Sequence, residues 1–180
     1  MSNVLQGYEN LFASFEGRTK VTELHDQSNP DDAGPETHIE GEPGFYIVNT
    51  NSRQDPDAWR DMLSTSKAAA YYDRKQTIAK IPQGAVVFLF QTHVGIIAKG
   101  KTTSACQKTT CDGNPDEEFY VPLNMEWKLD EPGTWDQAVK ASEIKEKMKK
   151  YHPCLGTAYR IPQDMAEAID AIRSDKIAAK

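Results

Sequence analysis

Long apolar runs are missing from this sequence. No segment approaches the ~20 consecutive apolar residues of a membrane span, so we expect no membrane partner. The chain begins MSNVLQGYENLF, which lacks the basic and apolar regions of a secretory signal. Cysteine is scarce too, with three residues in 180, and an odd number without an export signal indicates a reducing compartment. Together these absences predict a cytoplasmic protein.

Recognisable catalytic motifs are also lacking. We find no nucleophile elbow, no phosphate-binding glycine loop, no framed pair of carboxylates and no nuclease signature. We therefore predict no catalytic residue and no cofactor. Basic residues are outnumbered by acidic ones, 21 against 27, and the net charge of −6 argues against binding of nucleic acid through bulk charge. A pocket that reads one base stays open, because local charge can differ from the total.

The thiols and one imidazole contain enough ligands for a zinc site. The residues concerned are Cys106, Cys111, His152 and Cys154. The second pair has only one residue between its members, which is unusual for zinc, and about forty residues separate the two pairs. We predict no metal site, with zinc as the alternative.

The most informative stretch is residues 81–102, IPQGAVVFLFQTHVGIIAKGKT. Six apolar residues follow the turn signal Pro82-Gln83-Gly84, and a β-branched and aromatic run of this length predicts a strand buried on both faces. Gln91-Thr92-His93 interrupts the run, and a second apolar segment follows. Two strands joined so tightly must pair antiparallel, because a parallel return needs a crossover of a dozen or more residues. The hairpin is the predicted centre of the domain.

Other elements follow from periodicity and from turn or capping signals. Asp55-Pro56 predicts the start of a helix, Ser66 a second helical turn over 68–74, and the capping-box pattern from Thr134 to Gln137 a helix to about residue 150. We predict further strands at 45–48, 118–123, 125–129 and 155–161, a polar loop at 102–115, and a closing helix from Pro162. Five or six mostly antiparallel strands with flanking helices make an α+β fold, either a small barrel or a strongly curved sheet.

The first 43 residues form a separate unit in this interpretation. Apolar residues at three- and four-residue steps from Leu5 to Phe15 predict a short amphipathic helix, which docks on the domain or binds a protein partner. Residues 26–35, DQSNPDDAGP, are acidic and rich in helix breakers, which predicts a flexible linker. Residues 44–180 are the predicted domain.

Three segments in the middle of the chain resemble a known superfamily. GFYIVNTNS is followed by a helix containing Trp59, then by GAVVFLFQTHVGIIAKGK and EEFYVPLNMEW. Together they resemble the PUA-like superfamily, and within it the EVE domains, over about residues 44–162. The hairpin segments FLFQ and GIIA are the most specific part, whereas the usual EVE opening WLVKSEP is here YIVNTNS. The resemblance implies a PUA-like domain and a non-catalytic reader of modified bases in DNA or RNA.

Such a reader flips the base out of the stack and holds it between aromatic faces and hydrogen-bonding edges. Asn and Gln amides both donate and accept hydrogen bonds, as the edge of a base requires. The resemblance therefore implies a ligand site formed by polar and aromatic residues near the strand ends, namely Asn49, Asn51, Ser52, Tyr71, Tyr72, Asp73, Phe90, Gln91, Thr92 and Trp127. The implied phosphate contacts are in the one dense basic run, at Lys147, Lys149 and Lys150.

Simpler interpretations stand beside this one. Gln91 and Thr92 could be ordinary turn residues, and the basic run a solvated helix face. The related ASCH domains suggest an enzyme instead, a small hydrolase of RNA or a modified nucleoside, which would need Lys80 or Lys99 beside Asp73. A third interpretation is a phage or host-defence module whose acidic N-terminal arm binds a protein.

The linker interpretation predicts a protease result. Residues 26–43 should be cut far faster than the rest of the chain, because an unpacked acidic segment exposes its backbone. Limited proteolysis followed by mass spectrometry should find a stable fragment that begins near Gly44. Equal resistance along the whole chain would contradict the linker.

Overall fold

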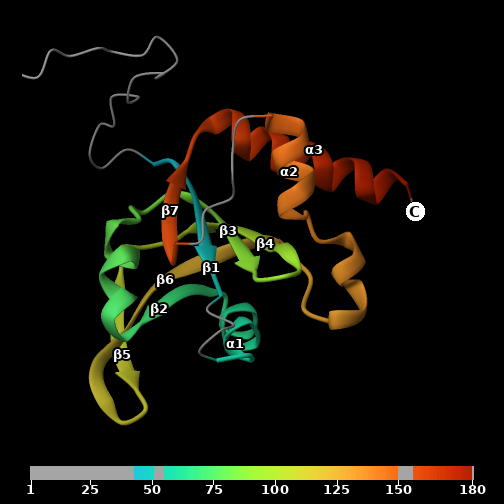
Figure 1. Cartoon of the computed structure of the whole chain (residues 1–180). Coiled ribbons are helices and arrows are strands. Elements are labelled where there is room, and N and C mark those ends of the chain that lie inside the picture. The colour runs from blue at the N-terminus through green and yellow to red at the C-terminus, as the bar shows by residue number, and fades with distance from the viewer. Residues whose placement is uncertain (1–42, 51–54, 150–155, 180) are drawn as a thin grey trace, which may run out of the picture. The chain divides into compact units, whose positions relative to one another are not determined.

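The computed structural model describes residues 43–50, 55–149 and 156–179 (Figure 1). The predicted N-terminal helix and linker lie outside these residues, as do Asn51, Ser52, Lys150, His152 and Cys154. The described elements, in chain order, are β1 (Phe45–Asn49), α1 (Ala58–Ser64), β2 (Lys67–Tyr71), the 3-10 helix η1 (Tyr72–Lys80), β3 (Val86–Gln91), β4 (Gly95–Thr102), β5 (Gln107–Cys111), β6 (Asn114–Lys128), the 3-10 helix η2 (Pro132–Gln137), α2 (Ala141–Met148), β7 (Ala158–Ile161) and α3 (Gln163–Ala178). None of the described helices is long and apolar enough to cross a membrane.

The strands form one curled sheet in the order β2-β6-β4-β3-β1-β7, with β5 also paired to β6. All pairs are antiparallel except β1 with β3, which run parallel. The two end strands, β2 and β7, both contact η1, so this helix lies between the edges of the half-barrel. The predicted α+β fold with a strongly curved, mostly antiparallel sheet is confirmed.

Two hydrophobic cores lie on opposite faces of the sheet. The inner core contains Val48, Val87 and Leu89, packed with Trp59 and other apolar residues of α1. The outer core contains the intervening side chains of the same strands, packed against α2 and α3, and includes Ile47, Phe88, Ile144, Met165 and Ile169. Burial on both faces explains the uninterrupted apolar run of β3, since each buried Leu, Ile or Phe contributes ~1.5–3 kcal/mol.

The prediction of a helical turn over 68–74 was wrong for its first half. Ala68, Ala69 and Ala70 belong to β2 and are completely buried against β6. Alanine favours helices in isolation, but here its small side chain lets the strand lie close to its neighbours, and tertiary packing outweighs propensity. The helical prediction holds only for η1, which follows.

Three further boundaries differ from the prediction. The polar segment 102–115 contains β5, which forms a hairpin with β6, and the two strands predicted at 118–129 are one strand with Pro122 inside it. The helix predicted from Thr134 is broken into η2 and α2, because Val139 pairs with Ile96 as an extended bridge between them. Polar strands and breaks in helices depend on partners that are distant in the sequence. Local periodicity therefore cannot predict them.

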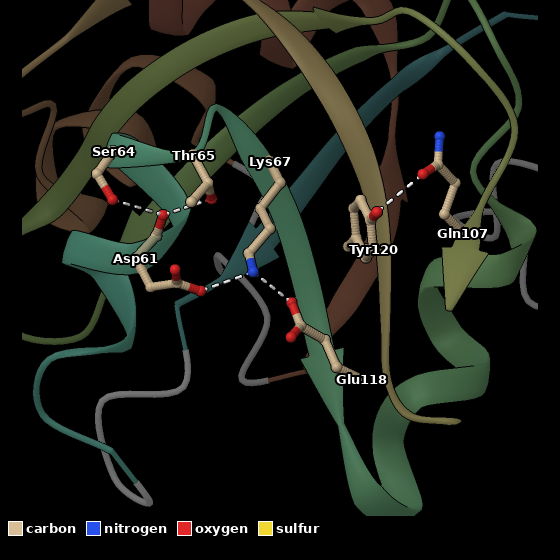
Figure 2. A network of polar contacts seen from close by, with 7 residues as sticks. All are labelled: Asp61, Ser64, Thr65, Lys67, Gln107, Glu118 and Tyr120. Atoms are coloured by element: carbon tan, nitrogen blue, oxygen red, sulfur yellow. Dashed lines mark hydrogen bonds and ion pairs between the residues drawn. The ribbon is translucent and has the colours of Figure 1, made fainter. Parts of the chain in front are cut away.

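A polar network links α1 to the β2–β6 pair (Figure 2). The Lys67 ammonium is 2.6 Å from Oε1 of Glu118 and 2.7 Å from Oδ2 of Asp61, and only 13% of the Lys67 side chain is exposed. Tyr120 lies under the ammonium and donates a hydrogen bond to Gln107 at 2.8 Å. Burial disfavours the charged form of Lys67, but the two carboxylates outweigh it, so the pKa of Lys67 is raised. Lys67 therefore stays charged at neutral pH, and its contribution to stability is lost as the pH rises through that raised pKa.

Removing Lys67 should destabilise the fold. We expect Lys67→Met to lower the free energy of unfolding by about 2–3 kcal/mol in urea denaturation, because Glu118 would be left buried without its partner. Adding Glu118→Gln should recover most of the loss. The control is Lys128→Met, which removes an exposed ion pair with Asp130 and should change stability by less than about 1 kcal/mol. A double variant no more stable than Lys67→Met would contradict the role of the pair.

Candidate functional site

The parallel pairing of β1 with β3 brings two polar strand ends to one edge of the sheet. Asn49 is opposite Phe90 in the register, and Thr50 and Gln91 directly follow this pair. The backbone N–H of Thr50 donates to the Phe90 carbonyl at 3.0 Å, which continues the ladder by one step. The ends of β1 and β3 thus place hydroxyl and amide groups next to a buried sheet.

Gln91 is held in a defined position at this edge. Its side chain is 6% exposed, and the fully buried Thr50 donates its hydroxyl hydrogen to Oε1 of Gln91. The amide nitrogen of Gln91 has no hydrogen-bond partner among the described residues. This nitrogen is not one of the fully buried unpaired polar atoms of the described residues, so its two N–H donors are accessible to water or to a bound molecule.

Backbone contact at Gly95 brings α2 to the same edge. Gly95 is opposite Gln91 in the β3–β4 hairpin, and the next residue, Ile96, exchanges two hydrogen bonds with Val139 at 2.9 and 3.2 Å. Gly95 has a φ of +129°, and a Cβ there would lie 2.4 Å from the Val139 carbonyl oxygen and 3.1 Å from the Lys140 Cα. Only glycine permits this approach.

Two tryptophans lie on the segments that adjoin this edge. Trp59 of α1 is 3% exposed and contacts the half-buried Trp135 of η2 edge-to-face, with ring centroids 5.1 Å apart. The carbonyl of Trp135 accepts from Ala138, which precedes the Val139 bridge to β4. The Arg60 guanidinium lies 4.9 Å from the Trp59 ring centroid. We call Thr50, Gln91, Gly95 and Trp135 the mouth of the inner core.

The structure places three other predicted residues next to the mouth. The Asn49 amide donates to the Thr92 hydroxyl at 3.5 Å across the strand ends. Phe90 packs against the outer core and is therefore on the opposite face from Gln91. Asn49 is the register partner of Phe90, so Asn49 and its partner Thr92 lie at the same strand end as Gln91 but on the face of Phe90.

Trp127 lies elsewhere on the sheet. It pairs with Lys99, four residues along β4 from Gly95, and the Arg173 guanidinium of α3 lies 4.9 Å from its ring centroid. Arg173 also donates to the carbonyl and the side-chain oxygen of Gln137, at 3.3 and 3.4 Å. The structure therefore joins Trp127 to α3 rather than to the Gln91 amide.

Tyr71, Tyr72 and Asp73 follow one another at the end of β2 but do not act together. Tyr71 is half-buried opposite Glu118, and burial, followed by the Glu118 charge, raises the pKa of Tyr71. Tyr72 turns to the β5–β6 hairpin, where its hydroxyl donates to Asp112, and this hydrogen bond raises the pKa of Tyr72. Asp73 is exposed on η1.

The predicted phosphate contacts Lys147 and Lys149 are exposed at the C-terminal end of α2. Cys106 and Cys111 lie before and at the end of β5, and at about 3.4 Å per residue their Cα atoms are roughly 17 Å apart. These two thiols cannot bind one zinc ion, whose bonds to sulfur are about 2.3 Å long. The described part of the chain contains no group of three or more potential metal ligands.

Three residues of this region were missed by sequence reasoning. Thr50 contacts Gln91 through the β1–β3 pairing. The Ile96–Val139 bridge brings Lys140 to Gly95, and Trp135 packs on the inner core beside Trp59. A signal for Thr50 was present, because it lies inside the polar segment that follows the first predicted strand. Trp135 and Lys140 lie in what reads as one helix, so nothing local indicates their position.

Comparisons with known proteins yield distant structural likenesses only. No family model matches the chain, and no curated protein matches its sequence. The YTH domain-containing protein mmi1 in complex with RNA is 12% identical, with a TM-score of 0.48, over 78% of this chain and 92% of that one. The YTH domain of Zygosaccharomyces rouxii MRB1 in complex with N6-methyladenosine RNA gives the same values. A hypothetical protein from Leishmania major is 8% identical, with a TM-score of 0.48, over 77% and 99% of the two chains.

Likenesses at this level carry no argument about function. The mouth is therefore interpreted from its own geometry.

Gly95 should be indispensable for the shape of the mouth. We expect Gly95→Ala to lower the free energy of unfolding by more than the ~1–3 kcal/mol of an unfavourable backbone conformation, since the new methyl group would also collide with Val139. Gly113→Ala is the matched control, because Gly113 has a φ of +79° but a methyl group there would meet no atom within 4 Å. Urea denaturation of both variants measures the difference. Equal losses would show that the close approach is not required.

Proposed function

We propose that this protein reads modified nucleobases in DNA or RNA, holding one base at the mouth after it has left the stack. The observation that carries the proposal is the Gln91 side chain, which is only 6% exposed, accepts at Oε1 from Thr50, and has N–H donors without a partner among the described residues. A site of this kind favours a ligand edge that presents hydrogen-bond acceptors. Purine and pyrimidine edges supply such acceptors through ring nitrogens and carbonyl oxygens.

The half-buried Trp135 supplies the stacking surface in this proposal. Trp59 supports it from α1 through the edge-to-face contact, which fixes the orientation of the indole. Stacking of a base on an aromatic ring contributes about 1–3 kcal/mol and tolerates any base. Discrimination between bases must then come from the amide and from the fit around the modification, because an unmatched buried donor is costly.

The charge of the domain is compatible with a nucleic-acid ligand. Residues 1–42 contain nine acidic and two basic residues and so carry −7, whereas residues 43–180 contain 18 acidic and 19 basic residues and carry +1. The acidic total therefore belongs to the N-terminal segment. The exposed Lys147 and Lys149 on α2 are the proposed sources of sequence-independent attraction.

The residues named for the hydrolase alternative are not arranged for catalysis. Lys99 is ion-paired with Asp170 at 2.9 Å and Glu126 at 3.0 Å, which joins β4, β6 and α3. Asp73 and Lys80 are both exposed on η1.

Binding experiments can separate the two tryptophans. In titrations with single- and double-stranded oligonucleotides carrying N6-methyladenine, 5-methylcytosine or no modification, Trp135→Ala should weaken binding by about 1–3 kcal/mol. Trp127→Ala, whose ring contacts Arg173, is the matched comparison and should leave affinity nearly unchanged. Loss of binding in Trp127→Ala but not in Trp135→Ala would move the stacking surface to the α3 side.

The Gln91 amide should decide selectivity. Gln91→Met keeps the shape of the side chain and removes its donors, so the preference for modified over plain bases should fall more than the affinity for either. Gln107→Met, a change in an exposed glutamine of β5, is the control. If no modified base is preferred and a nucleoside is hydrolysed, the ASCH-like alternative is favoured. If neither occurs, the protein-interaction alternative is favoured.

A further inference from the structure

The segment that links η2 to α2 presents a lysine on the Gln91 side of the sheet. Ile96 and Val139 both belong to the outer core and pair with each other. Ala138, one residue earlier, belongs to the inner core. Since side chains alternate along an extended segment, Lys140 faces the same side as Ala138, which is the side of Gln91.

Backbone contact fixes the position of Lys140 beside the hairpin. The Lys140 Cα would lie 3.1 Å from a Cβ at Gly95, and Gly95 is the register partner of Gln91. The Lys140 N–H donates to Oε2 of Glu143 at 2.7 Å, which fixes the start of α2. The side chain is exposed, and its ammonium is in none of the ion pairs found among the described residues.

An ammonium group at this place can bind the phosphate backbone of a nucleic acid. The proposed base is held by an uncharged amide and an indole, so nothing in the mouth itself binds the charged backbone that must enter with a flipped nucleotide. A lysine binds phosphate as a point charge on a long stem and tolerates variation in the path of the strand. Lys147 and Lys149 lie about two turns further along α2, roughly 10–14 Å from Lys140, and so further from Gly95 than Lys140 is.

We propose that Lys140 binds the backbone phosphate next to the bound base, an inference that rests on the proposed function. Its contact makes the ligand a nucleotide within a strand rather than a free base or nucleoside. A contact with only one of the two flanking phosphates would favour one direction of the strand across the mouth. Lys147 and Lys149 then contribute general attraction without this positional effect.

Chemical neutralisation of single phosphates tests the contact. The probes are short single-stranded DNAs with one central N6-methyladenine or 5-methylcytosine, made with a neutral methylphosphonate in place of either the 5′ or the 3′ flanking phosphate. Lys140→Ala should weaken binding of the all-phosphodiester probe about two- to fivefold, the size expected for an exposed ion pair. It should also reduce the magnitude of the log–log salt slope by about one contact, roughly 0.7 on a single strand.

The decisive result is non-additivity. One methylphosphonate probe should bind wild type about two- to fivefold more weakly, and the same probe should bind Lys140→Ala no more weakly than the all-phosphodiester probe does. Lys80→Ala, in an exposed lysine of η1, should keep the full methylphosphonate effect. Equal methylphosphonate effects in wild type and Lys140→Ala would overturn this inference while the proposed function stands. If wild type binds neither modified probe, the proposed function fails, and the inference with it.

Discussion

The parallel pairing of β1 with β3 determines where polar groups of this chain can meet. A parallel pair needs a long crossover, and α1, β2 and η1 supply it. Along the pair, side chains alternate between an inner core and an outer core, so every position from Tyr46 to Val48 on β1 is buried. Polar side chains are accommodated only where the ladder ends. Because the two strands point the same way, both of their ends lie at one edge, and Thr50 meets Gln91 there.

The sequence was most informative where local signals and tertiary structure agree. The sequence predicts an antiparallel hairpin from the apolar run of β3, the turn at Gln91–His93 and the second apolar run in β4. The structure contains this hairpin. Prediction failed where burial is supplied by a distant partner. Three alanines of β2 were predicted as helix, because no local signal indicates that they pair with β6. The polar strand β5 was predicted as a loop, because it is a strand only through its pairing with the start of β6. The helix break at Ala138–Val139 has the same origin, since two hydrogen bonds to Ile96 replace those of a continuous helix.

The residues of the candidate site also fall into those that local sequence signals predict and those that depend on distant contacts. Asn49, Gln91 and Thr92 follow predicted strands, and the structure places them side by side. Trp135 and Lys140 could not be found in this way, because Trp135 is placed by its contact with Trp59 and Lys140 by the bridge between Ile96 and Val139. That bridge depends in turn on the absence of a side chain at Gly95. One glycine with a positive φ therefore connects the hairpin, which the sequence reveals, to the η2–α2 segment, whose placement it does not reveal.

The balance of charge determines which interactions a reader built in this way can use. With a net charge of +1 on residues 43–180, a reader of this kind would gain little from long-range attraction and more from the contacts of one base. Stacking on Trp135 would supply affinity without choice among bases, because every base has an aromatic face. The Gln91 amide would supply choice, since a ligand edge without acceptors would displace water from its N–H donors and leave them unpaired. Neither interaction specifies the direction of the strand, because both act on the base alone. A cation at Lys140 would favour one direction, and the Gly95–Val139 contact positions the backbone from which its side chain extends.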